Sequence, residues 1–301
     1  MGDEATPKRE CAQMTCRISR RACLGALALV LGCRASGGRG GGPGSRIRTR
    51  VVSVTPNTTE TVFALGVGGR LVGRSRYCDY PVEVAGVPVV GGYVDPSLET
   101  ILGLRPDLVV GARGPMGKGL VDKLEGRGIE CYFPQTESVH EVFQMIMGVA
   151  ERMDAKSRCG SLLESMRNGL RKVEKAVHGR YKPRTLLVFG HSPVSVAGPG
   201  SFSDEMLTLA GCDNAVKHGT RYPILGFETI IGLDPDLIVD ATMFSGQNAE
   251  AIGNRPGWAS VRAVREGRVS KIDSDQVLRP GPRLAEGVEL ICRNAHVGVE
   301  I

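Results

Sequence analysis

A twelve-residue segment occurs twice in this chain, and the two copies begin 129 residues apart, at Glu99 and at Glu228. The first copy reads ETILGLRPDLVV and the second reads ETIIGLDPDLIV, so nine of the twelve positions are identical. Each copy opens with apolar residues at helical spacing, passes through Pro-Asp, and ends in an aliphatic run typical of a buried parallel strand. Because secondary-structure preference alone rarely produces identity this dense, we expect a duplicated lobe. The alternative is one large domain that repeats a common helix–strand element.

A two-lobed molecule offers a cleft between its lobes, and clefts are where small molecules bind. The length of 301 residues accommodates two domains of ordinary size. Hydrophobic content of 42% and charged content of 23% are those of a globular protein. The net charge of +6 includes no basic block that would follow a phosphate backbone, so no nucleic-acid partner is expected.

Residues 1–33 are predicted to be a lipoprotein signal peptide. Arginines precede an apolar run from Ala22 to Leu31, and about ten residues are too few for a membrane span, which needs about 20. The sequence Val-Leu-Gly-Cys that ends at Cys33 resembles a bacterial lipobox, in which the cysteine is lipidated. Residues 34–49 are rich in glycine and are predicted to be a flexible tether. We therefore expect a protein of the periplasm or cell surface, lipid-anchored to a membrane; an unprocessed apolar helix is the alternative, and both Met1 and Met14 are candidate start residues.

Strands alternate with helices through the rest of the chain, which predicts parallel sheets. The N-terminal lobe is predicted to cover residues 50–153 and the C-terminal lobe residues 180–301. Between them, residues 154–179 contain no proline and have apolar positions at helical spacing. They predict a linking helix from about Ala155 to Val177, roughly 34 Å long at 1.5 Å per residue. The expected fold class is α/β, with two Rossmann-like lobes joined by a single long helix and a ligand cleft between the lobes.

Two local patterns refine this prediction. Asn57 followed by Glu60 three residues later is a capping-box pattern, which predicts the start of a helix that ends near Gly66. The second lobe carries about 16 extra residues between its first strand and its first helix. Its Gly198-Pro199-Gly200 sequence predicts an added β-turn there.

Four motifs give the chain a family resemblance. They are RVVSVTP from Arg50, SRYCDYP from Ser75, GGYVDPSLE from Gly91 and RPGPRL from Arg279. Together they resemble the substrate-binding proteins of iron-siderophore, haem and cobalamin ABC importers, the class III periplasmic binding proteins. The resemblance covers the chain from about Arg50 to its end. It implies two α/β lobes joined by one long helix, which close through small rotations only.

The resemblance also gives the repeat a role. It implies that Glu99 and Glu228 dock onto arginines of the membrane permease. Two carboxylates related by duplication suit a permease made of two equal halves. The alternative for each is a solvated glutamate that the helix dipole favours. The implied partners are an ABC transporter permease dimer with its ATPase, a small-molecule ligand, and a membrane through the lipid anchor; the protein itself is expected to be a monomer.

Ligands of doubly wound sheets bind beyond the carboxyl ends of the strands. The residues expected around the ligand are Tyr93, Tyr222, Arg113, Asn57, Thr58, Tyr77 and Phe244. The ring of Tyr93 either stacks on the ligand or, if the ligand is haem, ligates its iron; a loop tyrosine packed on its neighbours is the alternative. Arg113 is suited to a propionate, a phosphate or a siderophore carboxylate. The expected ligand is a corrinoid such as cobalamin, a ferric siderophore or haem, and no intrinsic cofactor is expected.

The cysteines and histidines point away from a metal site. No Cys-x-x-C pair occurs beyond the signal peptide, and the five histidines are scattered, so a bare transition-metal site is not expected. The resemblance implies a disulfide between Cys212 and Cys292, although Cys212 is shifted by two residues from the family position. No catalytic motif is complete, so the protein is not expected to be an enzyme. A chelatase-like tetrapyrrole or metal-handling enzyme of the same architecture is the alternative function, and a purely structural lipoprotein is a third possibility.

Overall fold

The computed structural model describes residues 48–113, 118–242, 252–272 and 274–301. All of them belong to the second of the two units into which the chain divides, Met1–Gly44 and Ser45–Ile301. The predicted signal peptide, including Cys33, and most of the predicted tether therefore lie outside the described residues.

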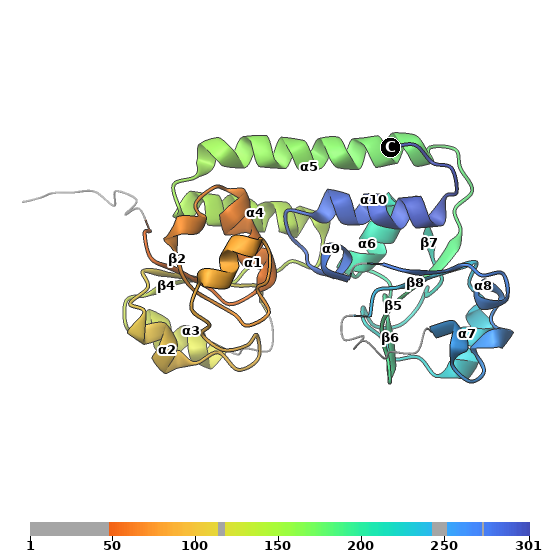
Figure 1. The fold of residues 1–301 in the computed structure, drawn as a ribbon, viewed down its shortest axis with the longest axis horizontal. Helices are drawn as coiled ribbons and strands as arrows, with labels where there is room; N and C mark the ends of the chain where they lie inside the picture. The colour runs from red at the N-terminus through yellow and green to blue at the C-terminus, as the bar shows by residue number, and fades with distance from the viewer. Residues whose placement is uncertain (1–47, 114–117, 243–251, 273) are drawn as a thin grey trace, which may run out of the picture. The chain divides into compact units, whose positions relative to one another are not determined.

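The first lobe is built on a sheet with the order β2-β1-β3-β4, in which all neighbours are parallel. Its elements are β1 (Val51–Ser53), α1 (Pro56–Ala64), β2 (Leu71–Arg74), α2 (Leu98–Gly103), β3 (Leu108–Val110), α3 (Lys118–Glu125), β4 (Glu130–Tyr132) and α4 (Val139–Arg152), with short 3-10 turns at Gly68–Arg70 and Val82–Gly86. Strands and helices alternate, as the sequence predicted (Figure 1).

The second lobe repeats this plan with one addition. Its sheet has the order β6-β5-β8-β9, and β7 also pairs with β5. The strands are β5 (Arg184–His191), β6 (Val194–Val196), β7 (Asp213–Asn214), β8 (Leu237–Asp240) and β9 (Val269–Lys271). The helices are α6 (Phe202–Leu209), α7 (Phe227–Leu233), α8 (Arg262–Arg265), α9 (Ser274–Leu278) and α10 (Leu284–Ala295), with 3-10 turns at Ile252–Asn254 and Trp258–Ser260. β6 is antiparallel to β5 and lies in the extra segment, where the sequence predicted an added turn.

Helix α5 (Lys156–Val177) follows α4 and leads into β5. Its buried positions are Cys159, Leu163, Met166 and Val173, which keep helical spacing along one face. That face packs against α4 and α10, so one helix contacts both lobes (Figure 1). The α/β fold with two lobes and a long connecting helix is confirmed.

Each sheet separates two apolar cores, because neighbouring strand residues point to opposite faces. Val51 and Leu187 face a core that the two lobes share beneath α5. Val52 faces a core private to the first lobe, and Leu186 faces one private to the second. The aliphatic strand runs therefore have both faces covered, as continuous apolar strands require.

The duplicated segments share a left-handed residue between helix and strand. Arg105 and Asp234 occupy equivalent positions, and both have left-handed φ values, 46° and 40°. The aspartate two residues later is used in the same way in both lobes. Asp107 Oδ1 accepts from the Arg50 amide at 3.2 Å, and Asp236 Oδ2 accepts from the Arg184 amide at 2.9 Å. Each copy thus ties its helix–strand turn to the start of the first strand of its own lobe.

Two local predictions were wrong. The capping box is absent, because α1 begins at Pro56 with Thr55 as N-cap, and no side chain caps it. The carboxylate of Glu60 instead forms ion pairs with arginines of the second lobe. Cys212 and Cys292 are both free thiols buried in the shared core, so the implied disulfide is absent. Burial raises the pKa of Cys212 to about 12.

Candidate functional site

Tyr93 is presented by a tight loop between β2 and α2. Gly91 has a φ of 111°, and a Cβ there would lie 2.5 Å from the carbonyl oxygen of Asp95, so only glycine suits the turn. Arg76 braces the loop through an ion pair with Asp95 at 2.9 Å. The Tyr93 hydroxyl donates to the carbonyl oxygen of Arg113 at 3.4 Å, so two of the residues predicted to bind ligand are neighbours.

Tyr222 lies on an extended segment beside β6. Backbone hydrogen bonds on both sides of it join this segment to the β5–β6 hairpin. Its ring packs against Phe189 of β5, with ring centroids 5.9 Å apart. Its hydroxyl donates to Glu137 Oε2 at 2.7 Å, although the two residues are 85 positions apart and belong to different lobes.

Glu137 is one of three residues of this site that sequence reasoning missed, together with Gln135 and Glu141. It lies between β4 and α4, and its backbone amide donates to Glu141 Oε2 at 2.7 Å. Burial raises the pKa of Tyr93, and the negative charge of Glu137 raises it further. Burial and then the hydrogen bond to Glu137 likewise raise the pKa of Tyr222. Both tyrosines are therefore neutral phenols near neutral pH. The available signal was the position of Glu137 after the carboxyl end of a parallel strand.

Arg113 is exposed and is linked to Glu137 through the side chains of Gln135 and Glu141. With its amide oxygen turned toward Arg113, Gln135 accepts from Nη1 at 3.2 Å and donates to Glu141 Oε1 at 3.2 Å. Polar contacts therefore run from Arg113 through Gln135 and Glu141 to Glu137, and from there to Tyr222. We call these five residues, together with Tyr93, the tyrosine site.

Asn57 and Thr58 are placed differently. Both are buried in the first turn of α1. The Thr58 hydroxyl lies 2.8 Å from that of Ser53 and 2.9 Å from that of Thr55, and Asn57 Nδ2 donates to the carbonyl oxygen of Pro280 at 3.2 Å. Because Thr58 has no exposed surface, its hydroxyl serves the structure of the lobe in this conformation.

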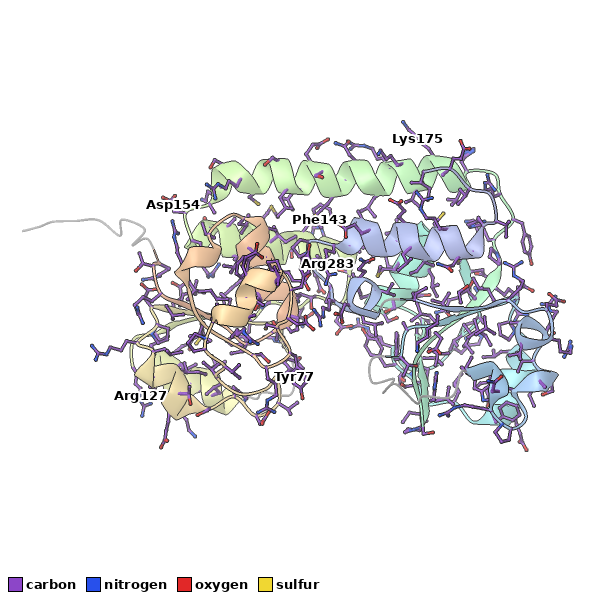
Figure 2. All side chains as sticks on the ribbon, viewed as in Figure 1. Tyr77, Arg127, Phe143, Asp154, Lys175 and Arg283 are labelled. Atoms are coloured by element: carbon purple, nitrogen blue, oxygen red, sulfur yellow. The ribbon has the colours of Figure 1, made fainter. Side chains whose placement is uncertain are left out.

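The last two predicted ligand residues are Tyr77 and Phe244. Tyr77 is 42% exposed, on the part of the first lobe that lies away from α5 (Figure 2). Phe244 lies outside the described residues.

The two glutamates that the sequence predicted to dock onto the permease occupy equivalent exposed positions. Glu99 is in the first turn of α2, and Glu228 is in the first turn of α7. Ser97 caps α2 by accepting from the Thr100 amide at 3.2 Å. Both helices thus present a carboxylate at the positive end of the helix dipole.

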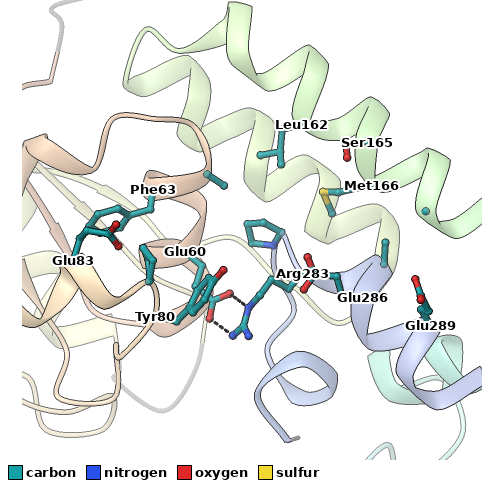
Figure 3. Close-up of a pocket in the computed structure, with 15 residues that line it drawn as sticks. Glu60, Phe63, Tyr80, Glu83, Leu162, Ser165, Met166, Arg283, Glu286 and Glu289 are labelled. Carbon is teal, nitrogen blue, oxygen red and sulfur yellow. Dashed lines mark hydrogen bonds and ion pairs between the residues drawn. The ribbon is translucent and has the colours of Figure 1, made fainter. Parts of the chain in front are cut away.

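A hollow lies where α1 of the first lobe meets α10 of the second, beneath α5 (Figure 3). Its volume is about 610 Å³, and none of the predicted ligand residues lines it. One wall is a buried ion pair, in which Glu60 accepts from Arg283 Nε at 2.8 Å and from Arg283 Nη2 at 2.7 Å. Arg279 Nη1 also reaches Glu60, at 3.2 Å, and the guanidinium of Arg283 lies 4.2 Å from the centre of the Tyr80 ring. The RPGPRL motif thus joins the second lobe to the first.

Two general properties follow from the described part of the chain. Within it, no helix is both long and apolar enough to cross a membrane. Nor do three or more His, Cys, Asp or Glu side chains of these residues gather in a group that could hold a metal ion.

Comparison with known proteins places these features in context. The family model described as periplasmic binding protein matches residues 51–276. An uncharacterised ABC transporter substrate-binding lipoprotein, YvrC of Bacillus subtilis, is 32% identical over 82% of this chain and 80% of its own length. The vitamin B12-binding protein of Salmonella typhimurium is 26% identical over 81% of this chain and 88% of its own. A crystal structure of a periplasmic heme-binding protein from Pseudomonas aeruginosa superposes with a TM-score of 0.76 at 26% identity, covering 84% of this chain and 95% of that one.

Proposed function

Because the chain belongs to the periplasmic binding protein family, we propose that it is the substrate-binding component of an ABC importer. It captures its ligand outside the cytoplasm and delivers it to the permease, without catalysing a reaction. The proposed ligand is a corrinoid such as cobalamin, a haem or a ferric siderophore. Relatives named for binding vitamin B12 and heme support these ligand classes.

The observation that carries the proposal is the placement of Tyr93 and Tyr222. They lie 129 residues apart, in the register of the duplicated segment, and each precedes its repeat helix. One comes from each lobe, and the carboxylate of Glu137 acts on the pKa of both. Two aromatic rings at duplicated positions suit a large flat ligand held between lobes, because each ring supplies apolar stacking area and a polar edge.

Tyr93 is proposed to stack on the ligand rather than to ligate iron. A phenolate ligand must lose its proton, and burial together with Glu137 raises the pKa of Tyr93. The hydroxyl is already engaged as a donor to the Arg113 carbonyl oxygen. Both facts favour the neutral ring as a packing surface.

Delivery is proposed to use Glu99 and Glu228. Their exposure and their equivalent positions in two duplicated helices suit a receptor with two equal halves. Lipidation of Cys33 would keep the protein beside its permease, and the name of the Bacillus relative, which includes the word lipoprotein, supports this anchoring.

The test is an absorption spectrum of the protein purified from its native source, followed by titration of the ligand-free protein. Corrinoids, haems and ferric siderophores have distinct chromophores, so a saturable spectral change identifies the class. Turnover of a tetrapyrrole would favour the chelatase-like alternative. Absence of any saturable ligand would favour a structural lipoprotein.

A further inference from the structure

Glu137 places a negative charge beside two neutral phenols. Among the described residues, the hydroxyl of Tyr222 is the hydrogen-bond donor that the structure gives to its carboxylate. The cation closest along the contact chain, Arg113, is engaged by Gln135. Arg221 also acts on Tyr222, where it partly offsets the effect of Glu137. The carboxylate therefore keeps unused acceptor capacity at the tyrosine site.

The loop that carries Glu137 is held from both lobes. Its own amide is bound by Glu141 of α4. Two residues later, the Val139 amide donates to Glu205 Oε2 of α6 at 2.7 Å. A carboxylate fixed in this way is preorganised, so a ligand does not have to supply the energy to order it.

A fixed, partly buried carboxylate discriminates between ligand edges. Amide N–H or hydroxyl groups gain charge-assisted hydrogen bonds from it. Carboxylate groups meet like-charge repulsion, which costs several kcal/mol at a desolvated contact. The chemistry of the edge, rather than the area of the ring, then decides between ligands of similar size.

We propose that Glu137 is a specificity-determining residue that selects ligands edged with carboxamides, such as a corrinoid, over ligands edged with carboxylates, such as a haem. This inference rests on the proposed function and narrows its ligand class. In this proposal, Tyr93 and Tyr222 supply apolar contacts to the ring of either ligand, and Glu137 determines which ligand binds more tightly.

The experiment compares the affinities of the full-length protein in detergent for cyanocobalamin and for haemin, by calorimetric titration. The wild type is expected to bind cyanocobalamin at least tenfold more tightly. Glu137→Gln keeps the shape and an acceptor for Tyr222 but removes the charge. It should reduce the ratio of the two affinities on the order of tenfold. Tyr222→Phe, which keeps both the ring and the charge, should preserve the preference.

Glu205→Gln is the matched control, because it removes a carboxylate charge at the same loop but keeps a side-chain oxygen that can accept from the Val139 amide. An unchanged ratio in Glu137→Gln, the same change in Glu205→Gln, or a wild-type preference for haemin would overturn this inference alone. If the wild type shows no saturable binding of cyanocobalamin, haemin or ferrichrome, the proposed function fails together with it. Circular dichroism of each variant distinguishes altered preference from loss of the fold.

Discussion

Replacing Glu60 with glutamine is expected to destabilise the fold more than any other single charge neutralisation that we propose. The side chain of Glu60 is 3% exposed and accepts three hydrogen bonds from two arginines of the other lobe. The arginine side chains are themselves only 14% and 12% exposed. Removal of the charge therefore leaves cationic groups with little access to water.

The expected loss in free energy of unfolding depends on the partners that each arginine retains. Breaking a buried ion pair by removing one partner costs about 3–5 kcal/mol. Arg279 keeps Asp79 and Asp275 as partners, and glutamine still offers one oxygen, whose hydrogen bond is worth about 1 kcal/mol. Arg283 loses its charged acceptor but keeps the face of Tyr80. The expected loss in free energy of unfolding is therefore about 2–4 kcal/mol.

Urea denaturation followed by circular dichroism measures this loss. Glu286→Gln is the matched control, because Glu286 lines the same hollow but is exposed, and its change should stay within about 0.5 kcal/mol. The double variant Glu60→Gln with Arg283→Gln should lose less than the sum of the single variants, since the two residues share one interaction. A Glu60→Gln protein as stable as the Glu286→Gln protein would refute the idea that this ion pair holds the lobes together.

The remaining predictions concern docking, the ligand and pH. Glu99→Ala combined with Glu228→Ala should leave ligand affinity intact and abolish uptake in a transport assay, and wild-type docking should weaken as salt is raised; loss of ligand binding would contradict the docking role. Tyr93→Phe should be nearly neutral for binding, whereas Tyr93→Ala should cost about 1–3 kcal/mol, unless a haem spectrum collapses in the Phe variant and reveals coordination. Burial lowers the pKa of His296, so the folded state favours the neutral ring; the stability that this gives is present above the unfolded pKa of about 6.5 and is lost as pH falls through the folded value. Urea denaturation across this pH range should show the loss in the wild type and not in His296→Gln.

The sequence predicted those parts of the fold whose residues follow a local periodic pattern. The repeat at Glu99 and Glu228 predicted two equivalent helix–strand units, and the structure gives both the same left-handed turn. The long helix was predictable because its buried face recurs at helical spacing without an intervening proline. In each copy of the repeat, and in the long helix, the pattern that predicts the element lies in residues close together in the chain.

The features that sequence missed depend on distant partners. Glu60 fits a capping box by local spacing, but its partner Arg283 is 223 residues away and offers a stronger interaction than a backbone amide. Glu137 belongs to no motif, and its role is visible only when Tyr222, 85 residues away, is brought beside it. No local pattern specifies which surface of one lobe will face the other.

The shared core beneath α5 has a consequence for how this protein unfolds. Apolar residues of both sheets, of α4, of α10 and of α5 pack in one continuous cluster. Separating the lobes would expose that cluster on both sides, and its exposure costs free energy in proportion to apolar area. The duplicated halves are therefore thermodynamically one cooperative unit, and neither half retains a complete core without the other. Helix α5 is therefore part of the core of both lobes rather than a spacer between them.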